Sequence, residues 1–377
     1  MPEPPEVSVV IPCLNEAESI GECVTRAREV LGATETSFEV IVVDNRSEDG
    51  SEELAAAAGA TVVFEPRRGY GNAYLAGFAA ARGEYVVMID ADLTYDFGEI
   101  PRFVAELENG ADFVVGNRLS GLEPGSMHAL NRAGNALLSG FLNMLFPTPL
   151  SDAHCGLRAV RRDALRRLDL QSAGMELASE MIIRASREHL VVRELPISLH
   201  PRAGESKLSR FRDGWRHLRL ILVYNPTFLF ILPGLVLLAV GSILMVLVLA
   251  DVTISGRGLF VHTLIGASLL VVVGTQLVGF GLCARTYAVY QLGDRDRVIE
   301  GVQRRLGLEH GLALGALVVC AGVALGGVVV GRWISQGFGP LAEERLAVVA
   351  ATLVIVGTQI FFTSFLLSIM GLRRRSG

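Results

Sequence analysis

The first 120 residues alternate between short runs of Val and Ile and longer Ala-rich stretches. Nearly continuous apolar runs are typical of strands buried on both faces of a parallel sheet. The Ala-rich stretches suit helices that carry the chain back to begin the next parallel strand. We therefore predict an α/β domain with strands at Val7–Ile11, Val40–Val43, Tyr85–Ile89 and Phe113–Val115, and helices within Glu16–Leu31, Ser51–Ala58 and Asn72–Ala81.

A different pattern begins at Thr227, where long runs almost free of charge dominate the sequence. Each run has about the 20 residues that a helix needs to cross a bilayer. The pattern predicts four transmembrane helices, at Thr227–Ala250, Phe260–Cys283, Gly311–Gly331 and Leu346–Met370. We expect three parts: a cytosolic α/β domain at 1–200, a basic interfacial segment at 201–226 and an all-α transmembrane domain at 227–377.

Basic residues are concentrated in alternate loops, and such loops usually face the cytosol. They precede the first apolar run, separate the second from the third and follow the fourth, whereas the other two loops hold only Arg257, Arg332 and Arg345. The N-terminus also lacks the basic flank and long apolar core of a signal peptide. We predict a multi-pass membrane protein whose α/β domain and both termini are cytoplasmic.

Charge and cysteine content exclude other classes of protein. The net charge of −5 argues against general nucleic-acid binding. The five cysteines are scattered without a C-x-x-C pair, so neither a disulfide framework nor a zinc site is indicated.

The membrane half contains a short repeat. Val273-Gly-Thr-Gln276 in the second run recurs as Val356-Gly-Thr-Gln359 in the fourth, which favours a duplicated two-helix unit. The two glutamines need polar partners inside a membrane, either each other or a lipid headgroup, and contact between helices is the favoured interpretation. Association of copies through this domain is a further expectation.

A polar cluster follows each predicted strand of the soluble half. In open parallel sheets, ligands bind beyond the carboxyl ends of the strands, so these clusters predict one site. They are Asn15-Glu16, Asp44 to Gly50, Asp90-Ala-Asp92 and Gly116-Asn-Arg118.

Asp90-Ala-Asp92 carries the clearest chemistry. Two carboxylates two residues apart on extended backbone point the same way and can hold Mg²⁺ or Mn²⁺ against substrate phosphates. A second D-x-D, Asp294-Arg-Asp296, follows no strand and is interpreted as a solvated charge run.

Several neighbouring residues have two interpretations. Asn15 and Glu16 suit either a nucleotide site or the start of a helix, and Asp44 suits either a nucleotide contact or a turn. Gly69-Tyr-Gly71 lacks the third glycine of a dinucleotide fingerprint, which argues against a nicotinamide or flavin cofactor. It is either a turn or a close backbone approach to a sugar diphosphate.

Taken in order, six segments resemble the signature of family 2 glycosyltransferases, in the dolichyl- or polyprenyl-phosphate mannosyl- and glucosyltransferase branch. The resemblance covers about residues 6 to 220. The segments are Pro12-Cys-Leu-Asn-Glu16, Val43-Asp-Asn-Arg-Ser-Glu-Asp-Gly50, Asp90-Ala-Asp-Leu93, Gly116-Asn-Arg118, Asp152-Ala-His-Cys-Gly-Leu-Arg158 and Gly204-Glu-Ser-Lys-Leu208.

The resemblance implies a GT-A fold, which is a Rossmann-like, mostly parallel sheet, together with an inverting reaction that needs Mg²⁺ or Mn²⁺. It implies that Asp90 and Asp92 hold the metal and the diphosphate, and that Asp152 has a catalytic role alongside Asp92. The implied nucleotide contacts are Pro12, Asn15, Glu16 and Asp44, and the implied acceptor-phosphate contacts are Arg118, Arg132, Arg202 and Lys207.

The sequence departs from the family in two places. Thr94 stands where many members of the branch have a glutamine ligand, and Asp44-Asn45-Arg46 stands where Asp-Asp-Gly is commoner. The first departure bears on metal preference and the second on the contact to the nucleotide.

The expected reaction is transfer of a hexose from a nucleotide-sugar, of the GDP-mannose or UDP-glucose class, to a polyprenyl phosphate at the cytosolic membrane face. A phosphate monoester has a second pKa near 6, so the acceptor needs little help from a base. Asp152 is favoured for base or positioning work over Glu176 and Glu180.

Two alternatives remain. A processive polysaccharide synthase should contain a Q-x-x-R-W segment, and Arg212-Asp-Gly-Trp-Arg216 resembles it only superficially. The other alternative is a lipid-linked sugar transporter or scaffold whose transferase domain has lost activity.

Overall fold

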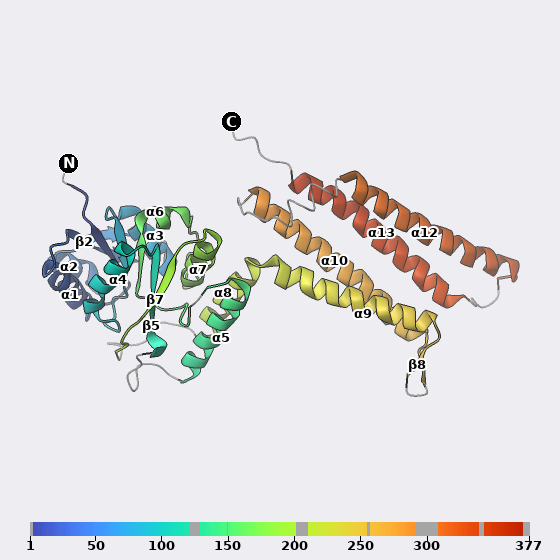
Figure 1. Cartoon of the computed structure of the whole chain (residues 1–377), viewed down its shortest axis with the longest axis horizontal. Coiled ribbons are helices and arrows are strands. Elements are labelled where there is room, and N and C mark those ends of the chain that lie inside the picture. The colour runs from blue at the N-terminus through green and yellow to red at the C-terminus, as the bar shows by residue number, and fades with distance from the viewer. Residues whose placement is uncertain are drawn as a thin grey trace. The chain divides into compact units, whose positions relative to one another are not determined.

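The computed structural model describes residues 3–120, 129–148, 150–200, 210–254, 257–291, 308–338 and 343–371 (Figure 1). The chain divides into two compact units, Met1–Tyr224 and Asn225–Gly377. The expected interfacial segment 201–226 is described from residue 210 onward, as a helix that belongs to the first unit.

The first unit is built on a seven-stranded sheet with the order β3-β2-β1-β4-β6-β5-β7. Strand β6 runs antiparallel to both of its neighbours, and every other pairing is parallel. The mostly parallel sheet and the four predicted strands are confirmed, and β3, β6 and β7 are additional. The strands are β1 (Val7–Cys13), β2 (Phe38–Asp44), β3 (Thr61–Phe64), β4 (Tyr85–Met88), β5 (Phe113–Asn117), β6 (Arg158–Arg161) and β7 (Val192–Pro196).

Helices connect these strands and surround the sheet (Figure 1). The helices are α1 (Ile20–Gly32), α2 (Ser51–Ala57), α3 (Tyr70–Ala80), α4 (Ile100–Glu108), α5 (Ala129–Leu145), α6 (Arg162–Arg167), α7 (Leu177–Arg187) and α8 (Arg210–Val223), with short 3-10 turns at Phe97–Glu99 and Arg118–Ser120.

Of the two interpretations of Asn15 and Glu16, the helix start is wrong, because α1 begins at Ile20. Asn15 has a φ of 52°, in the left-handed region that an N-cap residue does not adopt. Hydrogen bonds to the loop after β2 hold residues 15–17 in a nonhelical path, as detailed below.

The register of the sheet fixes where the loops emerge. Cys13, the last residue of β1, pairs with Asp44, the last residue of β2. Because β1 is paired in parallel with β4 on its other side, the polar segments after these three strands leave the same edge. We call this edge, with the end of β5, the carboxyl edge.

The second unit contains four helices long and apolar enough to cross a membrane, at Thr227–Leu249, Val261–Val289, Leu308–Ser335 and Glu344–Met370. They confirm the four predicted spans. The first begins with a π-helical turn at Thr227–Ile231, and the elements are α9 (Leu232–Leu249), a small hairpin of β8 (Thr253–Ile254) and β9 (Arg257–Gly258), α10 (Val261–Gln291), α12 (Leu308–Ser335) and α13 (Glu344–Met370).

Glycines bring the helices of each pair into backbone contact. A Cβ added at Gly274 of α10 would lie 2.6 Å from the Leu238 nitrogen and 2.7 Å from the Gly234 oxygen of α9. The same arrangement recurs between α12 and α13, where a Cβ at Gly357 would lie 2.7 Å from the Val319 nitrogen. Small residues that permit such close approach are typical of helix contacts in lipid.

The second pair of helices repeats the first beyond these glycines. Gly241 approaches Ala267 as Gly322 approaches Ala350, and the repeated Gln276 and Gln359 meet each other. The Gln359 amide nitrogen donates to the Gln276 oxygen at 2.9 Å. The predicted contact between helices is therefore confirmed, and the matched contacts support a duplicated hairpin.

The close approach at Gly274 generates a stability prediction. Gly274→Ala should lower the melting temperature of the detergent-solubilised protein, because the methyl group meets the α9 backbone and overpacking costs about 1–3 kcal/mol. Gly266→Ala in the same helix is the matched control, since nothing lies within 4 Å of its added Cβ. Equal melting temperatures for the two variants would contradict the packing described here.

Candidate active site

Three residues with left-handed backbone mark the carboxyl edge. Asn15, Arg46 and Leu93 have φ values of 52°, 68° and 58°, and each follows a different strand. Left-handed conformations cost non-glycine residues free energy and cluster at functional sites. The edge predicted to bind the substrate is thus also where the backbone is strained.

Hydrogen bonds join the loop after β1 to the loop after β2. The Asn15 amide nitrogen donates to Ser47 Oγ at 2.9 Å, and the Asn15 side-chain oxygen accepts from the Glu48 nitrogen at 2.8 Å. The Glu16 nitrogen donates to Ser51 Oγ at 2.9 Å. Pro12 and Glu16 are half-buried and Asn15 is exposed, so these three predicted nucleotide contacts line one side of the edge.

Asp44 and Asn45 organise the tip of β2. Asp44 is buried, and its carboxylate accepts from the backbone nitrogens of Arg46 and Ser47. The Asn45 amide group donates to the carbonyl oxygens of Glu65 and Arg67, both at 2.9 Å, and its oxygen accepts from the Gly69 nitrogen at 2.7 Å. A carboxylate could not donate these bonds, which explains asparagine at this departure from the family pattern.

Asp90, which follows the end of β4, accepts hydrogen bonds from two tyrosine hydroxyls. The hydroxyls of Tyr70 and Tyr74 donate to Asp90 Oδ1 at 3.1 and 3.4 Å. A Cβ at Gly156 would lie 2.4 Å from Asp90 Oδ2, so only glycine leaves room for this carboxylate. Burial, followed by the neighbouring Asp92 carboxylate, raises the pKa of Asp90 to about 6.

Asp92 is buried and is held by the residue that replaces the family glutamine. The Thr94 hydroxyl donates to Asp92 Oδ1 at 2.6 Å, and the Thr94 nitrogen donates to the same oxygen at 3.2 Å. Between the two aspartates, the Ala91 carbonyl accepts from Ser19 Oγ at 2.6 Å. Thr94 therefore positions Asp92 in this structure.

Gly69 and Gly71 make close backbone contacts within the protein. A Cβ at Gly69 would lie 2.3 Å from the Ala173 oxygen, and one at Gly71 would lie 2.0 Å from the Ser172 oxygen. Glu180 supports this second segment, since its carboxylate accepts from the Ser172 nitrogen at 2.7 Å. The glycines therefore serve packing beside the site.

Arg118 and Asp152 form a buried ion pair beyond β5. Arg118 Nε and Nη2 donate to the two Asp152 oxygens at 2.6 and 2.8 Å, and Asp152 is fully buried. The Asp152 nitrogen in turn donates to Glu194 of β7 at 2.8 Å. Removing one member of such a pair leaves a buried charge uncompensated, so each residue depends on the other.

Of the other three predicted acceptor contacts, the structure describes one. Arg132 is exposed on α5, and Arg202 and Lys207 fall outside the described residues. His200, the last described residue before the gap, donates from its backbone nitrogen to the Thr94 carbonyl oxygen at 2.9 Å.

Glu176 and Glu180 differ in their surroundings. Glu180 is buried, accepts from the Tyr224 hydroxyl at 3.0 Å and thus has a structural role. Glu176 Oε2 is buried and has no hydrogen-bond partner among the described residues.

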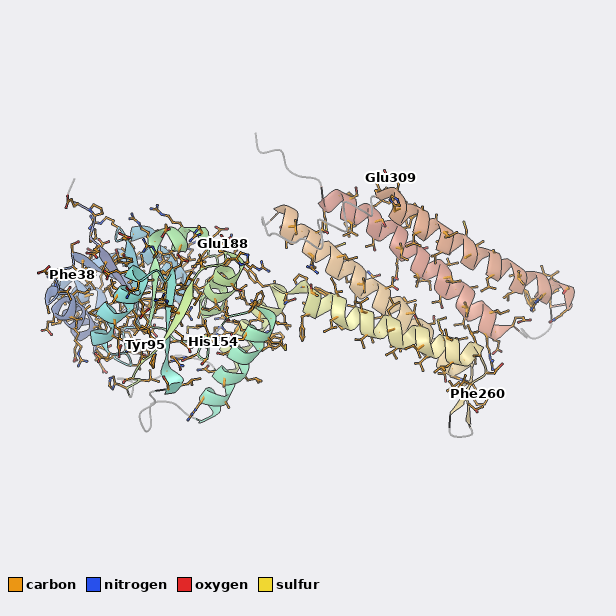
Figure 2. All side chains as sticks on the ribbon, in the orientation of Figure 1. Phe38, Tyr95, His154, Glu188, Phe260 and Glu309 are labelled. Carbon is orange, nitrogen blue, oxygen red and sulfur yellow. The ribbon has the colours of Figure 1, made fainter. Side chains whose placement is uncertain are left out.

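Two histidines form a network that the sequence analysis did not identify. The Ser179 hydroxyl contacts His154 Nε2 at 3.1 Å and His217 Nδ1 at 2.8 Å, and the ring centroids are 4.5 Å apart. Burial and the nearby Arg158 lower the pKa of His217 to about 4. Burial and His217 hold the pKa of His154 well below its usual range. Figure 2 labels His154 within the first unit.

Arg158 lies beneath this network and is almost fully buried. Its guanidinium donates to the carbonyl oxygens of Ala153, Cys155 and Ala178, at 2.8, 2.7 and 2.8 Å. These bonds join the segment that carries Asp152 to the start of α7.

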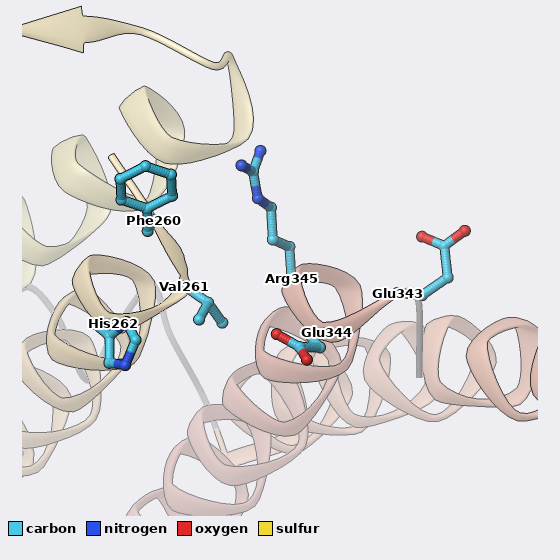
Figure 3. A pocket seen from close by; sticks show the side chains of 6 residues that line it. All are labelled: Phe260, Val261, His262, Glu343, Glu344 and Arg345. Atoms are coloured by element: carbon cyan, nitrogen blue, oxygen red, sulfur yellow. The ribbon is translucent and has the colours of Figure 1, made fainter. Parts of the chain in front are cut away.

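The second unit has a pocket of its own, between the starts of α10 and α13 (Figure 3). Two of its charged residues form ion pairs: Glu343 with Arg332 at 2.5 Å, and Arg345 with Asp251. The pocket contains none of the predicted site residues, and is lined by Phe260, Val261, His262, Glu343, Glu344 and Arg345.

The donor set at the carboxyl edge fits a divalent cation that is shared with a substrate. Across the described ranges, no group of three or more His, Cys, Asp or Glu could hold a metal by itself. Mg²⁺ is commonly bound by one or two carboxylates together with substrate phosphates, and Asp90 and Asp92 supply two. A cation between them would also offset the burial and the carboxylate repulsion that together raise the pKa of Asp90.

Comparison with known proteins identifies both units. The family model "Glycosyl transferase family 2" matches residues 8–169, and the model "Glycosyltransferase family 2 C-terminal transmembrane region" matches residues 282–371.

Individual relatives point the same way. The chain is 41% identical to the low-salt glycan biosynthesis hexosyltransferase Agl6 of Haloferax volcanii, over 97% of this chain and 89% of that protein. It is 33% identical to a dolichyl-phosphate hexose transferase of the same organism, over 55% of this chain and 89% of the relative. It is 34% identical to an undecaprenyl-phosphate 4-deoxy-4-formamido-L-arabinose transferase of Pseudomonas fluorescens, over 55% of this chain and 61% of that protein.

The lowered pKa of His217 predicts acid sensitivity. Between about pH 6.5 and 4, the unfolded chain binds a proton at His217 that the folded protein does not. The free energy of unfolding should therefore be highest above about pH 6.5 and fall toward pH 4. His217 contributes at most about 3 kcal/mol to this fall.

Melting temperatures across this range should fall more steeply for the wild type than for His217→Asn, which keeps a polar atom at the position of Nδ1 but does not titrate. Comparing the two curves cancels the contribution of carboxylates that titrate in the same range. Parallel curves would contradict the assignment.

Proposed function

Because this chain belongs to the family 2 glycosyltransferases, we propose that it transfers a hexose from a nucleotide-sugar to a polyprenyl phosphate, with inversion, at the cytosolic face of the membrane. The donor is of the GDP-mannose or UDP-glucose class. One observation carries the proposal: the carboxylates of Asp90 and Asp92 share an edge with Arg118, in a chain that continues into a membrane-crossing helix three residues after α8.

The donor side of the proposed site comprises the ends of β1, β2 and β4. Pro12, Asn15, Glu16 and Asp44 would border the nucleotide, and Asp90 and Asp92 would hold Mg²⁺ or Mn²⁺ together with the diphosphate. The bound cation neutralises the charge that develops on a departing diphosphate. Tyr70, Tyr74 and Thr94 keep the two carboxylates oriented for this purpose.

The acceptor side comprises Arg118, with Arg132, Arg202 and Lys207 as further cations. An acceptor phosphate is mainly dianionic at neutral pH, so it can attack the anomeric carbon without surrendering a proton to the protein. Both Asp152 oxygens accept hydrogen bonds from Arg118. We therefore assign Asp152 to orienting Arg118 rather than to proton transfer.

Exposed apolar side chains suggest how a membrane-bound acceptor reaches this side. Leu137 and Met144 of α5 are 75% and 62% exposed, and Trp215 and Val223 of α8 are 54% and 61% exposed. Helices α5 and α8 pack together, and Arg212 and Arg219 accompany Trp215 on the exposed side of α8. Such a mixture of aromatic and basic residues favours a membrane interface.

The printed activities of the relatives support a lipid phosphate acceptor, since one is a dolichyl-phosphate and another an undecaprenyl-phosphate transferase. The alternative of an inactive scaffold is weakened by the paired, well-oriented residues Asp90, Asp92, Arg118 and Asp152. The experiment below separates the two possibilities.

Detergent-purified protein should convert GDP-mannose or UDP-glucose, with polyprenyl phosphate and Mg²⁺ or Mn²⁺, into a product that extracts into organic solvent. Asp92→Asn should reduce this transfer by roughly a hundred-fold or more, because it removes charge from the centre that stabilises the leaving diphosphate. Asp294→Asn in the second D-x-D should leave transfer unchanged. A wild type without transfer or donor hydrolysis would reject the proposal in favour of a scaffold.

Thr94→Val should weaken Mn²⁺ binding in the presence of nucleoside diphosphate by about two- to ten-fold, the range expected for one lost hydrogen bond. The measurement is the free Mn²⁺ signal in electron paramagnetic resonance during titration. Thr94→Ser keeps the hydroxyl and should bind like the wild type. If the valine and serine variants bind equally, Thr94 does not position Asp92.

A further inference from the structure

Four elements of the first unit meet at the histidine network. Ser139 comes from α5, His154 from the segment after Asp152, Ser179 from α7 and His217 from α8. The Ala153 nitrogen donates to Ser139 Oγ at 3.1 Å, which lies 3.5 Å from His154 Nδ1. Ser139, Ser179 and His217 are all buried, so the network is an interior connection.

The hydroxyl of Ser179 bridges the two imidazole rings. A hydroxyl has one proton, so it donates to one of the two histidine nitrogens and accepts from the other. Two neutral imidazoles satisfy this arrangement, because each carries a single N–H. With either histidine as the donor, the hydroxyl bridges both rings and so joins α7 to α8 and to the segment after Asp152.

At one end the network reaches the Arg118–Asp152 pair. The backbone nitrogen of His154 donates to Asp152 Oδ1 at 3.3 Å, and Asp152 holds Arg118 in a two-point ion pair. A displacement of the His154 segment would therefore move Asp152 and, through it, the guanidinium of Arg118.

At the other end the network reaches the membrane anchor along the chain. His217 lies in the middle of α8, which ends at Val223, and the first membrane-crossing helix begins at Thr227. Arg187 of α7 reinforces this end, since its guanidinium donates to the Tyr224 carbonyl at 2.7 Å. Two independent contacts, Ser179 with His217 and Arg187 with Tyr224, therefore link α7 to α8 and to the residue that follows it.

We propose that Ser179, with His154 and His217, is the positioning element that sets the acceptor-binding guanidinium of Arg118 relative to helix α8. The inference rests on the proposed function, in which Arg118 binds the lipid phosphate. It adds that the acceptor site is aligned by the helix leading to the membrane, through groups that touch neither substrate.

The test compares two buried serines. Ser179→Ala removes the bridging hydroxyl and should raise the KM for polyprenyl phosphate roughly three- to ten-fold, while the KM for the nucleotide-sugar stays unchanged. Ser8→Ala is the matched control. Ser8 is equally buried, and its hydroxyl makes two hydrogen bonds, to Glu39 and from Gly83, near the start of β1. It should alter neither KM.

A second pair of variants keeps the inference testable if Ser179→Ala is unstable. His217→Asn retains a polar atom at the Nδ1 position and should keep a near-normal acceptor KM, whereas His217→Ala should raise it. Unchanged acceptor KM in both Ser179→Ala and His217→Ala, or equal changes in donor and acceptor KM, would overturn the inference. A wild type that does not use polyprenyl phosphate would instead refute the proposed function.

Discussion

The repulsion between two carboxylates at the carboxyl edge is the constraint on which the site depends. Asp90 and Asp92 are next to each other in a partly dehydrated setting, and burial together with the Asp92 charge raises the pKa of Asp90. Hydroxyl groups of Tyr70, Tyr74 and Thr94 hold the carboxylates in place, and Gly156 leaves the necessary space. The surrounding residues therefore maintain a charge arrangement that becomes favourable when a cation and a diphosphate arrive.

Arg118 and Asp152 solve a related problem by pairing charges of opposite sign in the interior. Their two-point contact fixes the guanidinium in a plane, and Glu194 and His154 hold the segment that carries the aspartate. The donor and acceptor sides thus differ physically. On the donor side two carboxylates of like charge are held where a cation would bind, and on the acceptor side the ion pair of Arg118 and Asp152 is held rigidly. Both depend on the ends of parallel strands for their alignment.

Much of this arrangement could be predicted from the sequence, because continuous apolar runs mark the buried strands and polar residues follow their ends. Strand β6 could not be predicted in this way, since Arg158 and Arg161 interrupt its pattern. In the folded protein Arg158 donates to carbonyl oxygens, and Arg161 pairs with Glu84 and Asp163. Asn15 looked like a helix cap, but Ser47 and Glu48 of another loop decide its conformation. The histidine network joins residues 139 to 217, a separation that local patterns do not reveal.

The glutamine contact in the membrane half makes two repeated hairpins unequal. Gln359 donates its amide proton to Gln276, while the Gln359 oxygen has no hydrogen-bond partner among the described residues. One copy of the motif thus acts as acceptor and the other as donor, although their sequences match. If the two hairpins arose by duplication, this hydrogen bond makes them different, because one glutamine must donate and the other must accept. A substitution that is tolerated at one glutamine therefore need not be tolerated at the other.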